Sequence, residues 1–163
     1  HGFNAMAGLH HREPGLIGAA LTDPRLTVSL IADGVHVHPA VLRLAFAAAP
    51  GRVALITDAV GWRTERLAGR GVRVVDGAPR LADGTLAGSA LTMDAAVRTV
   101  VAAGVDLASA LRAASTTPAR VLGLADRGRI EPGARADLVV LGVDLRPEQV
   151  WLGGVPVEVG GLR

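Results

Sequence analysis

Short apolar runs alternate with polar turns in the first part of the chain. The apolar residues 27–32 (TVSLIA) stop at Asp33, and Pro39 then opens a helical pattern, VLRLAFAAA. Proline suits the first turn of a helix because its missing N–H has no partner there. A second apolar run, residues 53–57, stops at Asp58. Strands that are apolar throughout and joined by a helix are typical of a parallel sheet covered on both faces. We therefore expect an α/β fold with its chemistry at the carboxyl ends of the strands.

The following segment predicts an antiparallel hairpin and then three helices. Residues 71–75 and 79–81 have the composition of two strands, joined by a turn at Asp76-Gly77. Three helical patterns come next, with expected starts at Thr92 or Asp94, after Asp106, and at Thr117-Pro118.

The end of the chain predicts short strands. A Pro-Gly turn precedes an apolar strand at residues 138–141, and a hairpin is expected from residues 149–152 and 155–159. Strands this short do not form a stable domain alone, so the tail must pack against other structure. We therefore expect a boundary that separates two domains, residues 1–127 and 128–163.

Composition narrows the range of functions. The chain has 163 residues, half of them apolar, and its 17 basic residues, all arginine, face 15 acidic ones for a net charge of +2. The arginines are scattered without interleaved aromatic residues, which argues against nucleic-acid binding. Cysteine is absent, so any metal must be held by His, Asp or Glu. No apolar run reaches the length of a membrane span and no targeting segment is visible, so we expect a cytoplasmic protein that binds no membrane.

Histidines gather near the start of the chain, where all five lie within the first 38 residues. His1 and His36 are the candidates for chemistry, because imidazole is a common ligand of zinc and iron. A catalytic metal usually takes three protein ligands, however, and the spacing here supplies no such set. His10 and His11 are neighbours in the sequence and are expected to point apart. Spacing alone therefore favours loop histidines over metal ligands.

Two further polar residues admit two interpretations each. Asp58 is either a turn residue or an acid–base group at the mouth of a barrel. Arg12 is either a surface arginine or, with Asn4 and backbone N–H groups, a ligand for phosphate. The GTLAGSALTM stretch lacks the lysine of a P-loop, and no G-x-S-x-G motif is present. The residues by themselves leave the reaction open.

Six motifs occur together in order: HGFNAMAGLHHREPG, IADGVHVHP, LITDA, GTLAGSALTMDAAVR, ASTTPARVLGL and GRIEPGARADLVVL. They resemble the carboxyl-terminal half of the N-acetylglucosamine-6-phosphate deacetylase family, in the amidohydrolase superfamily. The resemblance covers nearly the whole chain and is weakest at residues 60–82. It implies strands six to eight of a (β/α)8 TIM-like barrel at residues 1–127, and the carboxyl-terminal strands of a small β-sandwich domain at residues 128–163.

The resemblance also implies roles for individual residues. Asp58 would be the catalytic residue that takes a proton from water and returns it to the departing amine. His36 would contact substrate and donate to the acetamide oxygen or a sugar hydroxyl. A divalent metal is implied, zinc or alternatively iron, with its glutamate ligand and a further histidine ligand in a preceding half of the barrel. The remaining implied site residues are His1 as a metal ligand and, for the amino-sugar phosphate, Asn4, Ala5, Arg12 and Leu86.

The implied function is hydrolysis of N-acetylglucosamine 6-phosphate to glucosamine 6-phosphate and acetate, in amino-sugar catabolism. The resemblance implies a homodimer, in which Arg12 can act across the interface. One alternative is an amidohydrolase that cleaves a cyclic amide, although Arg12 and Asn4 favour a phosphorylated substrate. Another is a non-catalytic fragment or binding module, because a few strands of a barrel leave unpaired edges. For the isolated chain we expect no activity, with aggregation or weak metal binding.

Overall fold

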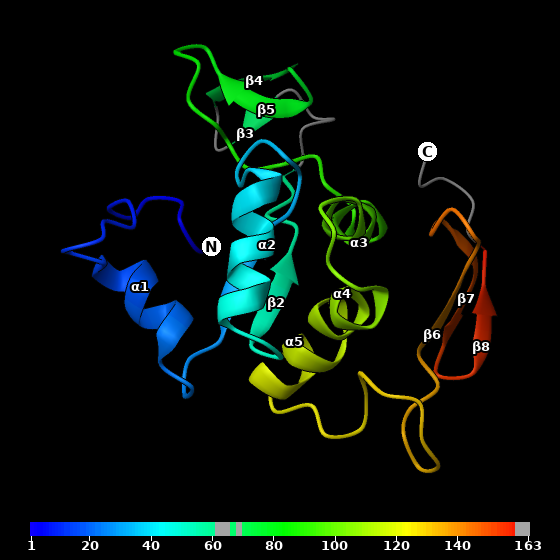
Figure 1. Cartoon of the computed structure of the whole chain (residues 1–163). Coiled ribbons are helices and arrows are strands. Elements are labelled where there is room, and N and C mark those ends of the chain that lie inside the picture. The colour runs from blue at the N-terminus through cyan, green and yellow to red at the C-terminus, as the bar shows by residue number, and fades with distance from the viewer. Residues whose placement is uncertain (61–65, 68–69, 159–163) are drawn as a thin grey trace.

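Two parallel strands form the centre of the structure (Figure 1). The computed structural model describes the chain in three stretches, residues 1–60, 66–67 and 70–158. Strand β1 (Val28–Ile31) pairs residue for residue with β2 (Val53–Ile56), and helix α2 (Pro39–Ala48) connects them. The predicted strand–helix–strand unit is thereby confirmed. Because parallel strands end at the same edge of a sheet, the loops that begin at Ala32 and Thr57 lie at one edge.

Three helices cover β2 and build the core from aliphatic side chains. They are α3 (Met93–Ala102), α4 (Leu107–Ala114) and α5 (Thr116–Val121), and each packs against β2. All three were predicted, although α5 begins at Thr116, two residues before the expected first helical residue, Pro118. Asp106 caps α4 as expected, because its Oδ1 accepts the N–H of Ser109 at 2.9 Å. Each fully buried Leu or Val side chain of this core contributes about 1.5–3 kcal/mol.

Helix α1 (Gly15–Thr22) was not predicted from the sequence pattern. Its sequence, GLIGAALT, has no polar face, so the amphipathic period that marks a helix is missing. The helix packs against α2, and its Ile17 and Leu21 side chains are buried. Tertiary packing rather than periodicity therefore holds this segment helical.

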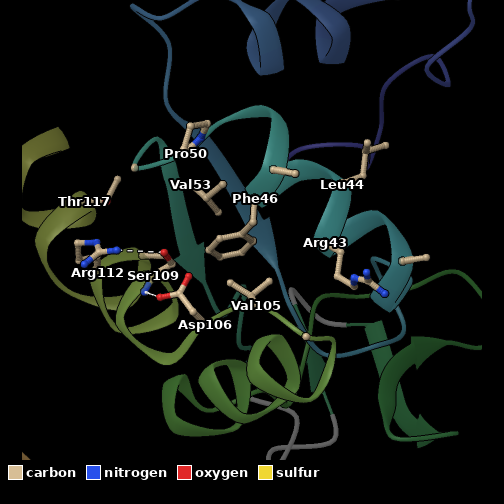
Figure 2. Close-up of a pocket in the computed structure, with 15 residues that line it drawn as sticks. Arg43, Leu44, Phe46, Pro50, Val53, Val105, Asp106, Ser109, Arg112 and Thr117 are labelled. Carbon is tan, nitrogen blue, oxygen red and sulfur yellow. Dashed lines mark hydrogen bonds between the residues drawn. The ribbon is translucent and has the colours of Figure 1, made fainter.

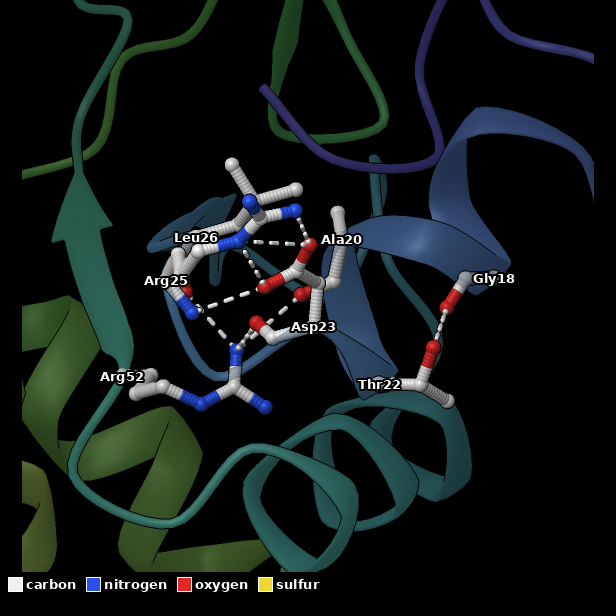
Figure 3. Close-up of polar contacts among 7 residues, drawn as sticks. All are labelled: Gly18, Ala20, Thr22, Asp23, Arg25, Leu26 and Arg52. Carbon is white, nitrogen blue, oxygen red and sulfur yellow. Dashed lines mark hydrogen bonds and ion pairs between the residues drawn. The ribbon is translucent and has the colours of Figure 1, made fainter.

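The guanidinium group of Arg52 fastens the end of α1 to the start of β2 (Figure 3). Its Nη1 donates to the carbonyl oxygens of Ala20, Asp23 and Leu26 at 3.1, 2.9 and 2.7 Å. Its Nη2 donates to the carbonyl oxygen of Leu21 at 2.6 Å. One side chain thus satisfies several carbonyl groups that a helix end leaves without partners. This network lies at the amino-terminal edge of the parallel strands.

Two antiparallel sheets complete the described structure. The first contains β3 (Arg66–Leu67), β4 (Arg70–Val75) and β5 (Ala78–Leu81), and the second contains β6 (Leu138–Leu141), β7 (Pro147–Leu152) and β8 (Val155–Val157). Both predicted hairpins are confirmed by the pairings of β4 with β5 and of β7 with β8. Val159, which the sequence assigns to the last strand, lies outside the described residues.

The carboxyl-terminal sheet stands beside α3 (Figure 1). Arg98 of α3 connects the two, because its Nη1 donates to the carbonyl oxygen of Leu145 at 3.2 Å and also binds Asp94 at 2.6 Å. The domain boundary near residue 127 and a β-sandwich role for residues 128–163 stay predictions. In the stretches that the structure describes, every helix is too short or too polar to cross a membrane.

Candidate active site

Asp58 lies just beyond β2, at the edge where the parallel strands end. Its backbone has a φ of 51°, a left-handed conformation that costs a non-glycine residue about 1–2 kcal/mol. Its carbonyl oxygen accepts the backbone N–H of Ser89 at 2.8 Å, while its side chain is exposed. A segment distant in the sequence therefore holds this turn in a strained form that presents a carboxylate to solvent.

Ser89 is the residue that holds the turn. It is fully buried, and its Oγ donates to the carbonyl oxygen of Thr57. Its own carbonyl oxygen accepts the N–H of Val60 at 3.1 Å. Gly88 approaches so closely that an added Cβ would lie 2.9 Å from the carbonyl oxygen of Asp58. The small residues of the GTLAGS motif thus bring its backbone against the Asp58 turn.

Asp33 and His36 form a close pair beyond the end of β1. Asp33 Oδ2 lies 2.6 Å from His36 Nδ1, and the two side chains are only 11% and 5% exposed. Asp33 Oδ1 accepts the backbone N–H groups of Val35 and His36 at 2.9 and 2.8 Å. Gly34 provides the positive φ, 78°, that this turn requires. Asp33 therefore holds both the backbone and the ring of His36.

The charge of Asp33 follows from these contacts. Burial raises the pKa of its carboxyl group, but hydrogen bonds from the backbone and ring of His36 and from the N–H of Val35 outweigh burial. The pKa of Asp33 consequently lies below its ordinary value of 3.8. The residue is a carboxylate at neutral pH.

The first residues of the chain lie beside β1. Gly2 donates its N–H to the carbonyl oxygen of Ser29 at 2.6 Å, and Asn4 Nδ2 donates to the carbonyl oxygen of Gly2 at 3.1 Å. His1 and Ala5 are exposed, and Ala5 has a left-handed φ of 52°. This backbone hydrogen bond places the start of the chain against β1.

The histidines next to Arg12 correct one expectation. The ring centroids of His10 and His11 lie only 4.4 Å apart, so the two rings do not point apart. The backbone N–H of Arg12 donates to His10 Nδ1 at 3.3 Å, and Arg12 Nη1 lies 2.8 Å from His11 Nε2. Both rings turn toward Arg12 because each offers it a ring nitrogen. The three side chains form an exposed cluster.

Leu86 lies half-buried where the GTLAGS motif crosses β5. It forms an antiparallel bridge with Arg80, and the next residue, Ala87, donates its N–H to the carbonyl oxygen of Pro79 at 2.9 Å. Arg80 Nη1 donates to the carbonyl oxygen of Gly84 at 2.9 Å. The GTLAGS motif therefore pairs with β5 at Leu86 and reaches the Asp58 turn three residues later, at Ser89.

The donor set for a metal is incomplete in this chain. No group of three His, Cys, Asp or Glu side chains that could hold a metal ion occurs among the described residues. A catalytic metal usually takes three protein ligands, so His1 is at most one of them. The residues present therefore do not by themselves fit a metal centre.

A cavity of about 580 Å³ lies on another part of the molecule, between α2 and α4 (Figure 2). Phe46 points into it, Arg43 lies on the α2 side, and Asp106 and Arg112 lie on the α4 side. Its lining comes from α2, α4 and α5, from the loops that precede β2 and α4, and from Val53 at the amino-terminal end of β2. This cavity is separate from the loops that carry the predicted site residues.

The structure brings together part of the predicted site. Asp58 and His36 share the edge where β1 and β2 end. Asp33 and Ser89, which hold these two residues, were not identified as site residues from the sequence. The spacing D-G-x-H, in which a turn aspartate precedes a histidine by three residues, is the signal for Asp33. No polar pattern distinguishes Ser89, because its partners are backbone groups.

The fold and these loops define a class, an α/β protein whose parallel strands carry polar residues at their carboxyl ends, as in barrel enzymes. The amidohydrolase family matches residues 5–157, and the chain belongs to this family. More particularly, its relatives are amino-sugar phosphate deacetylases. The N-acetylgalactosamine-6-phosphate deacetylase of Escherichia coli O157:H7 is 48% identical over 161 residues, which are 94% of this chain and 43% of the relative.

Two solved structures have a similar fold over the matched region. N-acetyl-D-glucosamine-6-phosphate deacetylase from Mycobacterium smegmatis, a mutant in complex with N-acetyl-D-glucosamine-6-phosphate, matches with a TM-score of 0.87 and 42% identity over 94% of this chain. The Pasteurella multocida N-acetylglucosamine-6-phosphate deacetylase matches with a TM-score of 0.88 and 29% identity over 96% of this chain. The chain spans 43% of each of these proteins. A relative in Escherichia coli K12, also 48% identical, is spanned over 96% of its length.

Proposed function

We propose that this chain is the carboxyl-terminal part of a deacetylase that hydrolyses the acetamide of N-acetylglucosamine 6-phosphate to glucosamine 6-phosphate and acetate. The observation that carries the proposal is the parallel pairing of β1 with β2, because it brings Asp58 and the Asp33–His36 pair to one edge. Relatives named for this activity support it, as does the Mycobacterium smegmatis complex with the sugar phosphate.

Asp58 would carry the proton transfers. Its exposed carboxylate would take a proton from the attacking water as the water oxygen bonds to the acetamide carbon. The same carboxyl group would give that proton to the amide nitrogen as the C–N bond breaks, so that the amine leaves neutral. His36 would hydrogen-bond a polar group of the substrate at the same edge, which orients the acetamide for attack.

Arg12 would bind the 6-phosphate. A guanidinium group offers paired donors to phosphate, and this one is exposed and therefore accessible also to a second subunit of a homodimer. Asn4, Ala5 and the backbone of Leu86 would contact the rest of the sugar phosphate. Binding energy from groups remote from the acetamide helps to position the reacting atoms.

A divalent metal, zinc or iron, belongs to the proposal as a cofactor of the complete barrel. When bound, such an ion polarises the amide and lowers the pKa of water. His1 would be the ligand that this chain contributes. The other ligands would come from the part of the longer relatives that this chain does not span, because the described residues do not supply them.

N-acetylgalactosamine 6-phosphate is a second candidate substrate. The relatives named for the glucosamine compound are 38–42% identical to this chain. The Escherichia coli O157:H7 relative named for the galactosamine compound is 48% identical. The two sugars differ at one hydroxyl group, so the same amide chemistry applies to both.

A fusion tests the proposal. The amino-terminal part of the Mycobacterium smegmatis deacetylase, joined to this chain, should release acetate from one or both sugar phosphates, whereas the chain alone should not. Asp58→Asn in the fusion should lower kcat at least about 100-fold. Asp144→Asn, an exposed carboxylate in the carboxyl-terminal sheet, is the matched control and should leave the rate unchanged. Undiminished turnover by Asp58→Asn, or cleavage only of cyclic amides, would refute the proposal.

A further inference from the structure

The pair formed by Asp33 and His36 restricts where the imidazole proton can lie. A carboxylate oxygen accepts hydrogen bonds and donates none. At 2.6 Å, an unprotonated Nδ1 would direct its lone pair at Asp33 Oδ2, and two acceptors would face each other in a nearly buried place. The neutral ring therefore carries its proton on Nδ1. Its Nε2 is then an acceptor.

The second carboxylate oxygen of Asp33 is bound to the backbone and fixes the orientation of the carboxylate toward the ring. Asp33 Oδ1 already accepts the two backbone N–H groups of Val35 and His36. The carboxylate thus has one oxygen committed to the backbone and the other to the ring. The lowered pKa of Asp33 agrees with a group that only accepts.

We propose that Asp33 is a positioning residue that fixes His36 as the Nδ1–H tautomer, so that Nε2 accepts a hydrogen bond from an N–H or O–H group of the substrate. The substrate part of this inference rests on the proposed function, but the tautomer does not. The neutral ring then cannot donate from Nε2 to the acetamide oxygen, the role that the sequence resemblance implies. A donor on the ligand, such as the amide N–H or a sugar hydroxyl, is the group that His36 selects.

The geometry predicts an unusual effect of Asp33→Asn. The single amide oxygen of asparagine must stay with the backbone N–H groups of Val35 and His36, because they need an acceptor. The amide NH₂ group then faces Nδ1, which has to become an acceptor. The proton should therefore move to Nε2, and the tautomer should reverse while the fold is retained.

The test is nitrogen NMR of the ¹⁵N-histidine-labelled chain at a pH where the ring is neutral. The His36 signals are those missing from His36→Gln, and magic-angle spinning gives the same nitrogen shifts if the chain self-associates. We expect a protonated Nδ1 in the unsubstituted chain, a protonated Nε2 in Asp33→Asn, and no change in Asp144→Asn, an exposed carboxylate that also accepts a nearby backbone N–H. An Nε2–H tautomer in the unsubstituted chain overturns the proposal, whatever the variants do.

Kinetics of the fusion separates this inference from the proposed function. Asp33→Asn should lower kcat about 10- to 100-fold, with KM changed much less, and Asp33→Glu should restore part of the loss. A tautomer that reverses without any effect on turnover would refute the role of Nε2 toward substrate. An inactive unsubstituted fusion would instead refute the proposed function, and the NMR result would still decide the tautomer.

Discussion

Ser89 donates its backbone N–H to the carbonyl oxygen of Asp58 at 2.8 Å, although the two residues belong to separate segments of the chain. The side chain of Ser89 donates to the carbonyl oxygen of Thr57, the residue before Asp58. The backbone and the side chain of Ser89 therefore both bind the same turn. Contacts from Ser89, which is distant in the sequence, thus stabilise the left-handed backbone of Asp58.

The buried hydroxyl group of Ser89 should therefore stabilise the fold. Ser89→Ala is expected to lower the free energy of unfolding by about 1–3 kcal/mol, because Thr57 and Leu91 lose a buried hydrogen-bond partner. Urea unfolding of the dilute chain, followed by circular dichroism, measures the loss. Ser115 also donates to a backbone carbonyl, that of Leu111, but is exposed. Ser115→Ala should cost about 0.5 kcal/mol or less, and equal losses would contradict the assigned role.

Gly88 should tolerate no side chain. An added Cβ would lie 2.5 Å from Val60 Cγ1 and 2.9 Å from the carbonyl oxygen of Asp58. Gly84 also has a positive φ, but an added Cβ there meets open space. Gly84→Ala should therefore show only backbone strain of about 1–2 kcal/mol, and Gly88→Ala should cost at least about 1 kcal/mol more. Thermal unfolding compares the two, and indistinguishable midpoints would show that the turn yields.

Arg52 should be an anchor of the fold. Arg52→Ala is expected to cost about 2–4 kcal/mol, because the helix-end carbonyl groups lose a shared donor. Arg52→Lys should recover little, since one ammonium group cannot replace the guanidinium fork. Arg25 forms an exposed ion pair with Asp23, so Arg25→Ala should change stability by about 0.5 kcal/mol or less. If both alanine variants unfold at the same urea concentration, Arg52 does not anchor α1.

Acid should loosen the loop beyond β1. A carboxyl group whose pKa is lowered by folding contributes stability above its unfolded pKa, and this contribution is lost as the pH falls through the folded value. The pKa of Asp33 lies below its ordinary 3.8, so the loss is expected as the pH falls below this ordinary value. Unfolding free energies over this range should fall more steeply for the unsubstituted chain than for Asp33→Asn. Parallel curves for the two proteins would count against the pair.

Most of the fold could be predicted from the sequence because its elements obey local rules. Apolar runs that stop at polar turns marked β1 and β2, proline marked the start of α2, and a capping aspartate marked α4. Helix α1 could not be predicted, because GLIGAALT has no polar face and is held by the burial of Ile17 and Leu21. Strand β3 likewise had no distinct apolar run.

In the candidate site, the sequence indicated polar residues such as Asp58 but not the residues that hold them in place. Asp58 was a candidate because a polar residue follows an apolar strand. Ser89 and Arg52 act on backbone carbonyl groups, and the sequence does not show which carbonyl groups lie near in space. The closeness of the His10 and His11 rings could not be predicted from the sequence either. It depends on the backbone conformation at Arg12, whose N–H donates to the His10 ring.

Arg52 and Asp58 stand at opposite ends of the same short strand. Substitutions in the loop that carries Asp58 are therefore remote from the Arg52 network, and substitutions around Arg52 are remote from the predicted site residues. We therefore expect that the stability of this chain and the properties of the candidate site can be changed by separate substitutions.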